Sequence, residues 1–341
     1  CEKGSSNIAQ NEITDNNGEY PIYGAAGFIK NVDFYKQDKP YIGIVKDGAG
    51  VGRVSVHPAK SSLIGTMQYI FPKENIDIKF LAEFLKYQNL SRFYTGATIP
   101  HIYFKDYQNI PLKLPSLQKQ KHISAVLDKC TALIAKHKLM LEKYDTLIKS
   151  RFIEMFGDIK EKEMIGVNAK LQGGYAFKSK DLTKEGVRLV QIGNVNKDNL
   201  TWDDIVYVPH SFLEKYSDYK LNEGDVVLAM TRPIIKSLNE VKIATVGKQD
   251  TNSLLNQRVG KFVLLNNKLN MCYLLYCCKT EEFKLYVEKM SGNSLQPNIS
   301  SKQVEDYKIP VPPLELQQQF AAFVQQIDKS KFENNYKELV A

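Results

Sequence analysis

The sequence lacks the features that would place it in a membrane or in a secreted disulfide-rich scaffold. Its 341 residues contain no run of about 18 apolar residues, and its first residues lack the basic-then-apolar pattern of a signal peptide. The five cysteines form no Cys-x-x-Cys pair and no Cys/His spacing typical of a metal site. Their odd number, with Cys277 and Cys278 adjacent, fits reduced thiols. We therefore expect a cytoplasmic protein that has no bound metal and is not in a membrane.

No catalytic motif is found in the context that it needs. The P-loop, HExxH and GxSxG patterns are absent. Gly48–Arg53 resembles a dinucleotide-binding fingerprint, but it lies between two predicted strands, so a tight hairpin is favoured. Asp225, Glu240 and Lys242 resemble the D…ExK site of nucleases, but the first half of the chain has no counterpart of the last two. We predict no catalytic residue in this chain.

Positive charge exceeds negative charge. The 46 Lys and Arg residues against 38 Asp and Glu residues give a formal net charge of +8. Such a balance favours polyanionic partners and speeds association with them. Many ordinary proteins are equally basic, so the charge alone supports nucleic-acid binding only modestly.

The chain repeats one motif after about 200 residues. Residues 107–120 read YQNIPLKLPSLQKQ, and residues 307–319 read YKIPVPPLELQQQ. Each passes from an Ile-Pro segment through a further proline to a Leu-Gln-x-Gln helix start, which aligns Gln118 with Gln317. Because proline fixes φ and disfavours helix in the residue before it, each Ile-Pro pair predicts an extended segment, and the periodicity after it is helical.

The segments upstream of the motif are also parallel in the two halves. In each half we predict a strand, a loop with a basic residue, a returning strand, a further strand, a helical segment and a glycine-bearing loop with a proline. The strand with its loop, the returning strand, the further strand, the helical segment and the glycine-bearing loop are residues 39–48, 50–56, 63–71, 80–94 and 96–101 in the first half and 222–232, 242–246, 254–264, 271–290 and 292–298 in the second. We predict a mixed α/β fold with two similar domains, residues 1–116 and 159–312. They alternate with helical spacers, residues 117–158 and 313–341, and we expect both ends of the chain to be truncated.

The first spacer has a heptad pattern sustained over four heptads, which is typical of a coiled coil. Its seam residues are Ile123, Leu127, Cys130, Ile134, His137, Leu141, Tyr144, Ile148, Arg151 and Met155. A helix of about 40 residues would be about 60 Å long, which is too long to be buried in one small domain. We predict that it pairs antiparallel with the second spacer helix, which starts near Leu316. The predicted interface with a partner helix consists of Ile123, Leu127, Ile134, Leu141, Tyr144, Ile148, Phe320, Val324 and Ile327.

Basic and amide side chains in loops between the strands are candidates for DNA contact. Arg and Lys suit guanine edges or phosphates, and Asn and Gln suit adenine edges. A solvated surface is the alternative for any one of them, but such residues recur in the same loops of both halves. The predicted DNA-binding residues are Lys46, Arg53, Gln68, Lys178, Arg232, Lys236, Asn256, Gln257 and Arg258.

This order of elements resembles the specificity subunits of type I restriction–modification enzymes. Residues 173–181 (GGYAFKSKD) and 187–195 (VRLVQIGNV) are similar to the opening of that family's target-recognition domain. The strand at 224–228, the exit at 309–319 and the helix end at 150–157 also resemble it. The first half departs from the pattern because it starts abruptly.

The resemblance implies a non-catalytic subunit that recognises double-stranded DNA. Each target-recognition domain would read one half of a bipartite target, and the helices would set the gap and dock modification subunits, two in number. A restriction subunit with motor and nuclease activity would join them. S-adenosylmethionine, Mg²⁺ and ATP would be bound by these partners, and no cofactor by this chain.

Two alternatives stay open at this point. The chain could be the recognition region of a single-chain restriction–methyltransferase, or a coiled-coil scaffold whose domains bind proteins. DNA affinity that falls steeply with salt would distinguish a DNA-binding protein from a scaffold.

Overall fold

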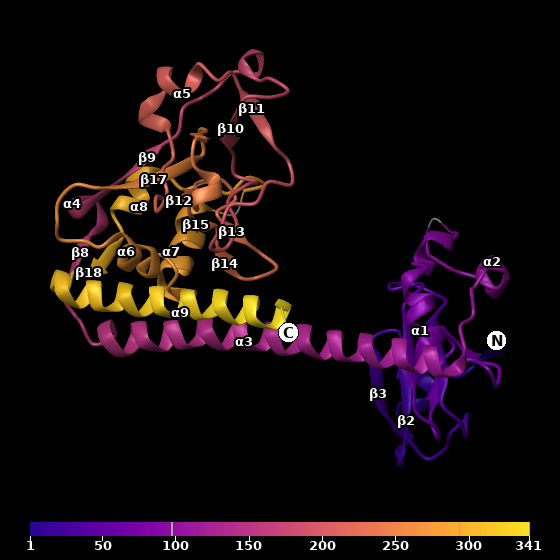
Figure 1. The fold of residues 1–341 in the computed structure, drawn as a ribbon. Helices are drawn as coiled ribbons and strands as arrows, with labels where there is room; N and C mark the ends of the chain where they lie inside the picture. Colours follow the sequence, from indigo (N-terminus) through magenta and orange to yellow (C-terminus); the bar gives the residue numbers. More distant parts are fainter. Residues whose placement is uncertain (97, 293, 341) are drawn as a thin grey trace. The chain divides into compact units, whose positions relative to one another are not determined.

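The computed structural model describes the backbone of residues 1–96, 98–292 and 294–340 and, within these ranges, the side chains up to Lys331. The chain divides into two compact units, residues 1–138 and 139–341 (Figure 1). Every helix in the described ranges is too short or too polar to cross a lipid bilayer.

Unit 1 contains two small β-sheets. Its strands are β1 (Glu2–Ser5), β2 (Tyr20–Gly24), β3 (Gly27–Val32), β4 (Tyr41–Val45), β5 (Val54–His57), β6 (Ser62–Leu63) and β7 (Met67–Phe71). The central sheet has the order β1-β7-β4-β5 and is antiparallel throughout, whereas the second has the order β3-β2-β6, with β2 and β6 parallel. Helix α1 (Ile78–Tyr87) begins where Asp77 caps the amide of Phe80 at 2.9 Å, and it packs on the central sheet. The short helix α2 (Phe104–Tyr107) follows.

Unit 2 has the same two sheets with insertions. Its strands are β8 (Lys162–Met164), β9 (Ala169–Gly173), β10 (Val187–Val190), β11 (Val206–Val208), β12 (Val226–Ala229), β13 (Ile234–Ile235), β14 (Glu240–Val241), β15 (Ile243–Thr245), β16 (Leu254–Leu255), β17 (Val259–Leu264) and β18 (Lys308–Pro310). Its short helices are α4 (Ile165–Asn168), α5 (Phe212–Lys215), α6 (Met271–Cys277), α7 (Glu281–Ser291) and α8 (Ser301–Glu305). Hairpin β13–β14 and the pair β8–β18 have no counterpart among the strands described in unit 1.

The strand order and register repeat from one unit to the other. The central sheet of unit 2 has the order β9-β17-β12-β15 and matches β1-β7-β4-β5, and β11-β10-β16 matches β3-β2-β6, again with one parallel pair. Val45 lies opposite Met67 just as Ala229 lies opposite Val259. This confirms the predicted mixed α/β fold with an internal repeat.

Helix α3 (Leu117–Phe156) confirms the predicted long helix, and α9 (Leu314–Val340) is the second spacer helix. Within unit 2 the two lie antiparallel and side by side (Figure 1). The ring of Phe320 lies 5.3 Å from that of Phe152 and 5.6 Å from that of Phe156, and Lys331 pairs with Asp145 at 3.2 Å.

The predicted helix-interface residues fall into two groups. The first group is buried in the core of unit 2 and consists of Ile148, Phe320, Val324 and Ile327. The half-buried Tyr144 packs against them. Toward its N-terminus the α3 seam is open: Ile123 is half-buried, and the exposed fractions of Leu127, Ile134 and Leu141 are 38%, 57% and 39%. That these residues contact a partner helix stays a prediction.

A buried glutamine joins each long helix to its unit. The Oε1 atom of Gln120 accepts from the amide of Asp77 at 2.9 Å. Its Nε2 atom donates to the carbonyls of Asn75 and Pro115 at 3.0 and 2.9 Å. The one side chain thus holds the α1 N-cap and the segment that enters α3.

Gln317 makes the same three bonds in unit 2. Its Oε1 atom accepts from the amide of Asn270 at 2.8 Å, and its Nε2 atom donates to the carbonyls of Lys268 and Pro312 at 2.8 and 2.7 Å. Asn270 caps α6 as Asp77 caps α1.

The structure corrects the alignment of the repeated motif. The residue equivalent to Gln317 is Gln120, whereas the sequence pattern aligned Gln118 with it. Gln118 and Gln319 are exposed. The first copy has two extra residues between its two prolines, Pro111 and Pro115, and these shift the register of the helix start.

Candidate nucleic-acid interface

Three loops of unit 2 meet at one end of its central sheet. They follow β12, precede β17 and precede α8. The amide of Met230 donates to the carbonyl of Arg258, and the amide of Ile299 donates to the carbonyl of Met230, both at 2.8 Å. The amide of Arg232 donates to the carbonyl of Pro297 at 2.8 Å. These loops, residues 230–232, 256–258 and 297–299, are called the loop end of unit 2.

The side chains at this loop end are bonded to one another. The hydroxyl of Thr231 donates to Oδ1 of Asn298 at 2.7 Å, and Nη1 of Arg258 donates to both of these oxygens at 3.3 Å. Arg232 and Arg258 have φ of +49° and +74°. This left-handed conformation costs energy for a residue with a side chain and is concentrated at functional sites. The hydrogen bonds to Thr231 and Asn298 thus hold the guanidinium group of Arg258 in place, whereas the exposed Arg232 is fixed at its backbone.

Positive charge lies at the loop end and around the β13–β14 hairpin that follows it. In the described part of the chain, no ion pair involves Arg232, Lys236, Lys242 or Arg258. Burial, together with the positive charge of Arg232, lowers the pKa of Lys242. Lys236 lies exposed in the turn of the β13–β14 hairpin. A polyanion would relieve this repulsion.

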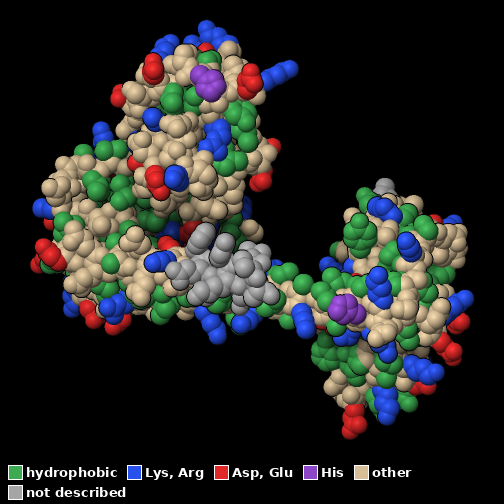
Figure 2. Space-filling model, in the orientation of Figure 1, with side chains coloured by type: hydrophobic (Ala, Val, Ile, Leu, Met, Phe, Trp, Pro, Cys, Tyr) green, Lys and Arg blue, Asp and Glu red, His purple; other side chains and the backbone are tan. Residues whose placement is uncertain are grey.

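On the face drawn in Figure 2, Lys and Arg side chains of unit 2 are scattered among acidic ones instead of forming one continuous patch. On that face, the hydrogen-bonded arrangement of the loops distinguishes the candidate site more clearly than the charge distribution does.

Tyr175 is a further candidate that the sequence-based set omits. Its amide donates to the carbonyl of Leu255 in β16 at 3.0 Å, and its carbonyl accepts from the amide of Gln257, in the loop before β17, at 2.8 Å. A Cβ on Gly174 would lie 2.2 Å from the carbonyl oxygen of Asn256, so this close approach needs a glycine. The Tyr175 side chain is exposed, as are those of Gln257 and Lys178. The sequence Gly173-Gly174-Tyr175 is the signal from which this candidate could have been predicted.

Unit 1 has the same loop end, formed by residues 46–48, 64–66 and 100–102. The amide of Lys46 donates to the carbonyl of Thr66 at 3.0 Å, and the amide of Ile102 donates to that of Lys46 at 3.0 Å. The amide of Gly48 donates to the carbonyl of Pro100 at 2.9 Å. These three bonds correspond one for one to those of unit 2.

The side chains at the loop end of unit 1 are different. An Asp47–His101 pair occupies the place of Thr231 and Asn298, and the ammonium group of Lys46 lies 3.8 Å from Asp47. The nearby Arg53 is exposed, and its Nη1 atom donates to the carbonyl of Ala25 at 2.8 Å. Lys46 and Arg53 thus belong to the same β4–β5 hairpin, in a different chemical setting from that of unit 2, and their contact with DNA stays a prediction.

The predicted role of Gln68 is wrong. Its side chain is 2% exposed in strand β7, and its Nε2 atom donates to the hydroxyl of Tyr107 at 2.7 Å. β7 lies inside the central sheet, with both faces covered, so an amide at this position is a core residue. Asn256 is half-buried, and its Oδ1 atom accepts from the amide of Gln257 at 2.8 Å.

The residues that resemble a nuclease site have separate partners. Asp225 pairs with Lys261 at 3.5 Å, whereas Glu240 pairs with Lys149 at 3.1 Å and with Lys197 at 3.6 Å. Each carboxylate is therefore committed to a different ion pair.

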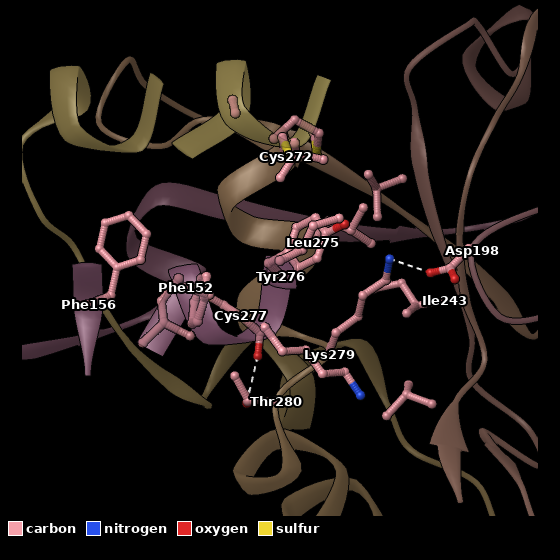
Figure 3. Close-up of a pocket in the computed structure, with 18 of the residues that line it drawn as sticks. Phe152, Phe156, Asp198, Ile243, Cys272, Leu275, Tyr276, Cys277, Lys279 and Thr280 are labelled. Carbon is pink, nitrogen blue, oxygen red and sulfur yellow. Dashed lines mark hydrogen bonds and ion pairs between the residues drawn. The ribbon is translucent and has the colours of Figure 1, made fainter. Parts of the chain in front are cut away.

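A cavity of about 1190 Å³ lies within unit 2, beside α3, α6 and α9 (Figure 3). Phe152 and Tyr276 contribute apolar surface, and Lys279 and Asp198 form an ion pair on its lining. Burial raises the pKa of the Cys272 thiol to about 11, so it is not a nucleophile near neutral pH. The predicted DNA-binding residues do not line this cavity.

Known proteins resemble the chain over most of its length. The sequence profile described as "Type I restriction modification DNA specificity domain" matches residues 1–143 and 158–340. The type I restriction enzyme MjaVIII specificity subunit of Methanocaldococcus jannaschii is 29% identical over 312 residues, which cover 83% of this chain and 71% of that protein. The EcoAI specificity subunit of Escherichia coli is 34% identical over 140 residues, 41% of this chain and 23% of that protein.

A solved structure shares the fold. The crystal structure of the type I restriction–modification system S subunit from M. genitalium superposes with a TM-score of 0.60 at 15% identity, over 98% of this chain and 89% of that chain. The two profile matches together cover nearly the whole sequence. The chain therefore belongs to the type I restriction–modification DNA specificity domain family and carries two regions of that family.

Proposed function

We propose that the chain is the DNA-recognition subunit of a type I restriction–modification enzyme, in which each family region reads one half of a bipartite double-stranded target. One observation carries the proposal. The same three backbone bonds join the loops in both units, whereas the side chains on those loops differ. A constant framework with variable contact groups suits two readers of different sequences, so the two half-sites differ.

The residues proposed to contact DNA lie at or beside the two loop ends. Guanidinium groups suit guanine edges in the major groove, and lysines suit phosphates. Arg258 and Arg232 are assigned to bases. The other proposed contact residues are Lys46, Arg53, Lys178, Lys236, Asn256 and Gln257.

The chain contributes recognition and not chemistry. Two modification subunits dock on the helices, where Leu127, Ile134 and Leu141 leave apolar surface exposed on α3, and a restriction subunit joins them. S-adenosylmethionine, Mg²⁺ and ATP bind to these partners. Exposed apolar surface of this kind favours a protein partner.

Co-expression with the modification subunit of the same operon, followed by mapping of methylated adenines, tests the proposal. We expect methylation at one split motif with a fixed gap. Arg258→Ala should cost about 1–3 kcal/mol at one base pair and relax the motif there. Lys170→Ala is a matched control, because Lys170 is an exposed cation at the opposite end of the same sheet.

Two results would contradict these assignments. Equal weakening on all sequences by Arg258→Ala would mark a phosphate contact and not a base contact. A stable complex that methylates no split motif, and whose DNA affinity does not depend on salt, would favour the protein scaffold.

A further inference from the structure

An apolar side chain lies in an equivalent loop beside the loop end of each unit. In unit 1, Ile99 in the loop before α2 is 65% exposed, and in unit 2, Leu295 in the loop before α8 is 98% exposed. In each loop a glycine with left-handed backbone precedes the apolar residue: Gly96 at φ +100° and Gly292 at φ +72°. A proline follows within two residues.

The chain just after each apolar residue is fixed to the loop end. In unit 2 the carbonyl of Pro297 accepts from the amide of Arg232, and the next residue, Asn298, accepts from the hydroxyl of Thr231. In unit 1 the equivalent bonds join Pro100 to Gly48 and His101 to Asp47. Leu295 thus lies two residues before Pro297, whose carbonyl is hydrogen-bonded to Arg232, a candidate for DNA contact.

Repetition distinguishes these two residues from ordinary exposed apolar residues. A single exposed leucine on a protein surface needs no explanation. Here, however, the neighbouring loop positions have diverged: Thr66 corresponds to Arg258, and His101 to Asn298. A branched apolar residue is nevertheless present in both loops. At 98% exposure Leu295 contributes almost nothing to the core, so its side chain is available to contact a bound partner.

We propose that Leu295 and Ile99 are wedge residues, each of which enters the DNA base stack beside the bases read by its loop end and kinks that half-site. This inference rests on the proposed function. Leu and Ile are among the side chains that unstack a base step in DNA-bending proteins. Lysines at or beside the loop ends, Lys46 in unit 1 and Lys236 in unit 2, hold phosphates near the step. Because pyrimidine–purine steps unstack most easily, each half-site contains such a step next to its read bases.

The test uses the full chain co-expressed with its modification subunit and a duplex that carries the mapped target. Fluorophores at the duplex ends report the bend, and 2-aminopurine beside the read bases reports unstacking. Leu295→Ala should reduce both signals in the second half-site and lower affinity for the target about tenfold. The salt dependence of binding should stay unchanged, because no phosphate contact is lost. Ile99→Ala should do the same in the first half-site.

Leu265→Ala is the matched control, since Leu265 is 52% exposed just after the opposite end of β17. It should leave the bend and the affinity unchanged. If Leu295→Ala complexes bend the target as the unaltered complex does, the wedge is wrong. A loss confined to one A·T pair, with a full bend, would reveal a thymine-methyl contact and also overturn it.

The remaining outcomes separate the wedge from the function on which it rests. If Leu295→Ala releases the modification subunit and leaves DNA bending intact, the loop binds protein and the wedge is overturned. If the unaltered complex methylates no split motif, the proposed function fails, and the wedge fails with it. A complex that methylates its motif on unbent DNA overturns the wedge alone.

Discussion

The two units have the same backbone framework and different interiors. In unit 1 the rings of Tyr41 and Tyr69 lie 4.9 Å apart between the two inner strands of the central sheet. The equivalent residues of unit 2 are Asp225 and Lys261, an ion pair at 3.5 Å. An aromatic contact and an ion pair thus fill the same place. The comparison shows that strand order and loop bonding are kept while the side-chain chemistry beneath them changes.

A second difference lies beside that pair. His57 in unit 1 is buried between Tyr23 and Tyr41, with ring centroids 4.4 and 5.4 Å away, and its Nε2 atom lies 2.7 Å from the hydroxyl of Ser55. The equivalent residue of unit 2 is the buried Val246. The core of unit 1 therefore contains a titratable group where the core of unit 2 has an aliphatic one.

The largest effect is expected from the glutamine that the units share. Gln120→Ala and Gln317→Ala each remove three buried hydrogen bonds and leave backbone groups without partners, which should cost about 3–5 kcal/mol of unfolding free energy. Each loss should be confined to its own unit. Hydrogen exchange of β4 and β12, followed by mass spectrometry, would assign the loss to unit 1 or unit 2.

Gln118→Ala and Gln319→Ala are the matched controls, because both side chains are exposed on the same helices. They should change stability by less than about 0.5 kcal/mol. Equal effects of Gln118→Ala and Gln120→Ala would refute the structural equivalence of Gln120 and Gln317.

Acid should destabilise unit 1 more than unit 2. Burial lowers the pKa of His57 to about 4, whereas a histidine in the unfolded chain titrates near 6.5. The unfolded chain therefore binds the proton more tightly, so the stability contributed by neutral His57 is present above about pH 6.5 and is lost as pH falls toward 4. The loss should reach about 3 kcal/mol.

The same exchange experiment at neutral and mildly acidic pH would measure this effect. Protection of β4 should fall with pH much more steeply than protection of β12. His57→Phe keeps a ring between the two tyrosines and should abolish most of the difference. A pH dependence that survives this substitution would assign the acid sensitivity to another group.

The sequence predicted the repeat and the long helix well because both depend on local signals. Proline fixes the extended exits, and the heptad pattern extends unbroken through α3. The alignment of the glutamines failed because two extra residues lie between the prolines of the first copy. The helical periodicity gives the correct alignment of the two glutamines, because Gln120 precedes Ile123 by three residues on the seam, as Gln317 precedes Phe320.

The site was less predictable because distant segments build it. Gln68 looked like a surface amide, yet its strand is covered on both faces, and one strand's sequence does not show its neighbours. Tyr175 reaches the loop end only through backbone bonds to β16 and to the loop before β17. Asn298 and Thr231 likewise meet across 67 residues. Such pairings follow from topology and not from local pattern.

The smallest expected effect concerns the ion pair that corresponds to the tyrosine pair. A double-mutant cycle with Asp225→Asn and Lys261→Met should give a coupling of about 0.5 kcal/mol, because partly exposed ion pairs contribute little. High salt should weaken it. The cycle of Tyr41→Leu and Tyr69→Leu should give about 1 kcal/mol and stay unchanged in salt, since ring contacts are not screened. If high salt weakened both couplings, the contacts would share an electrostatic origin, and the contrast between the two interiors would be wrong.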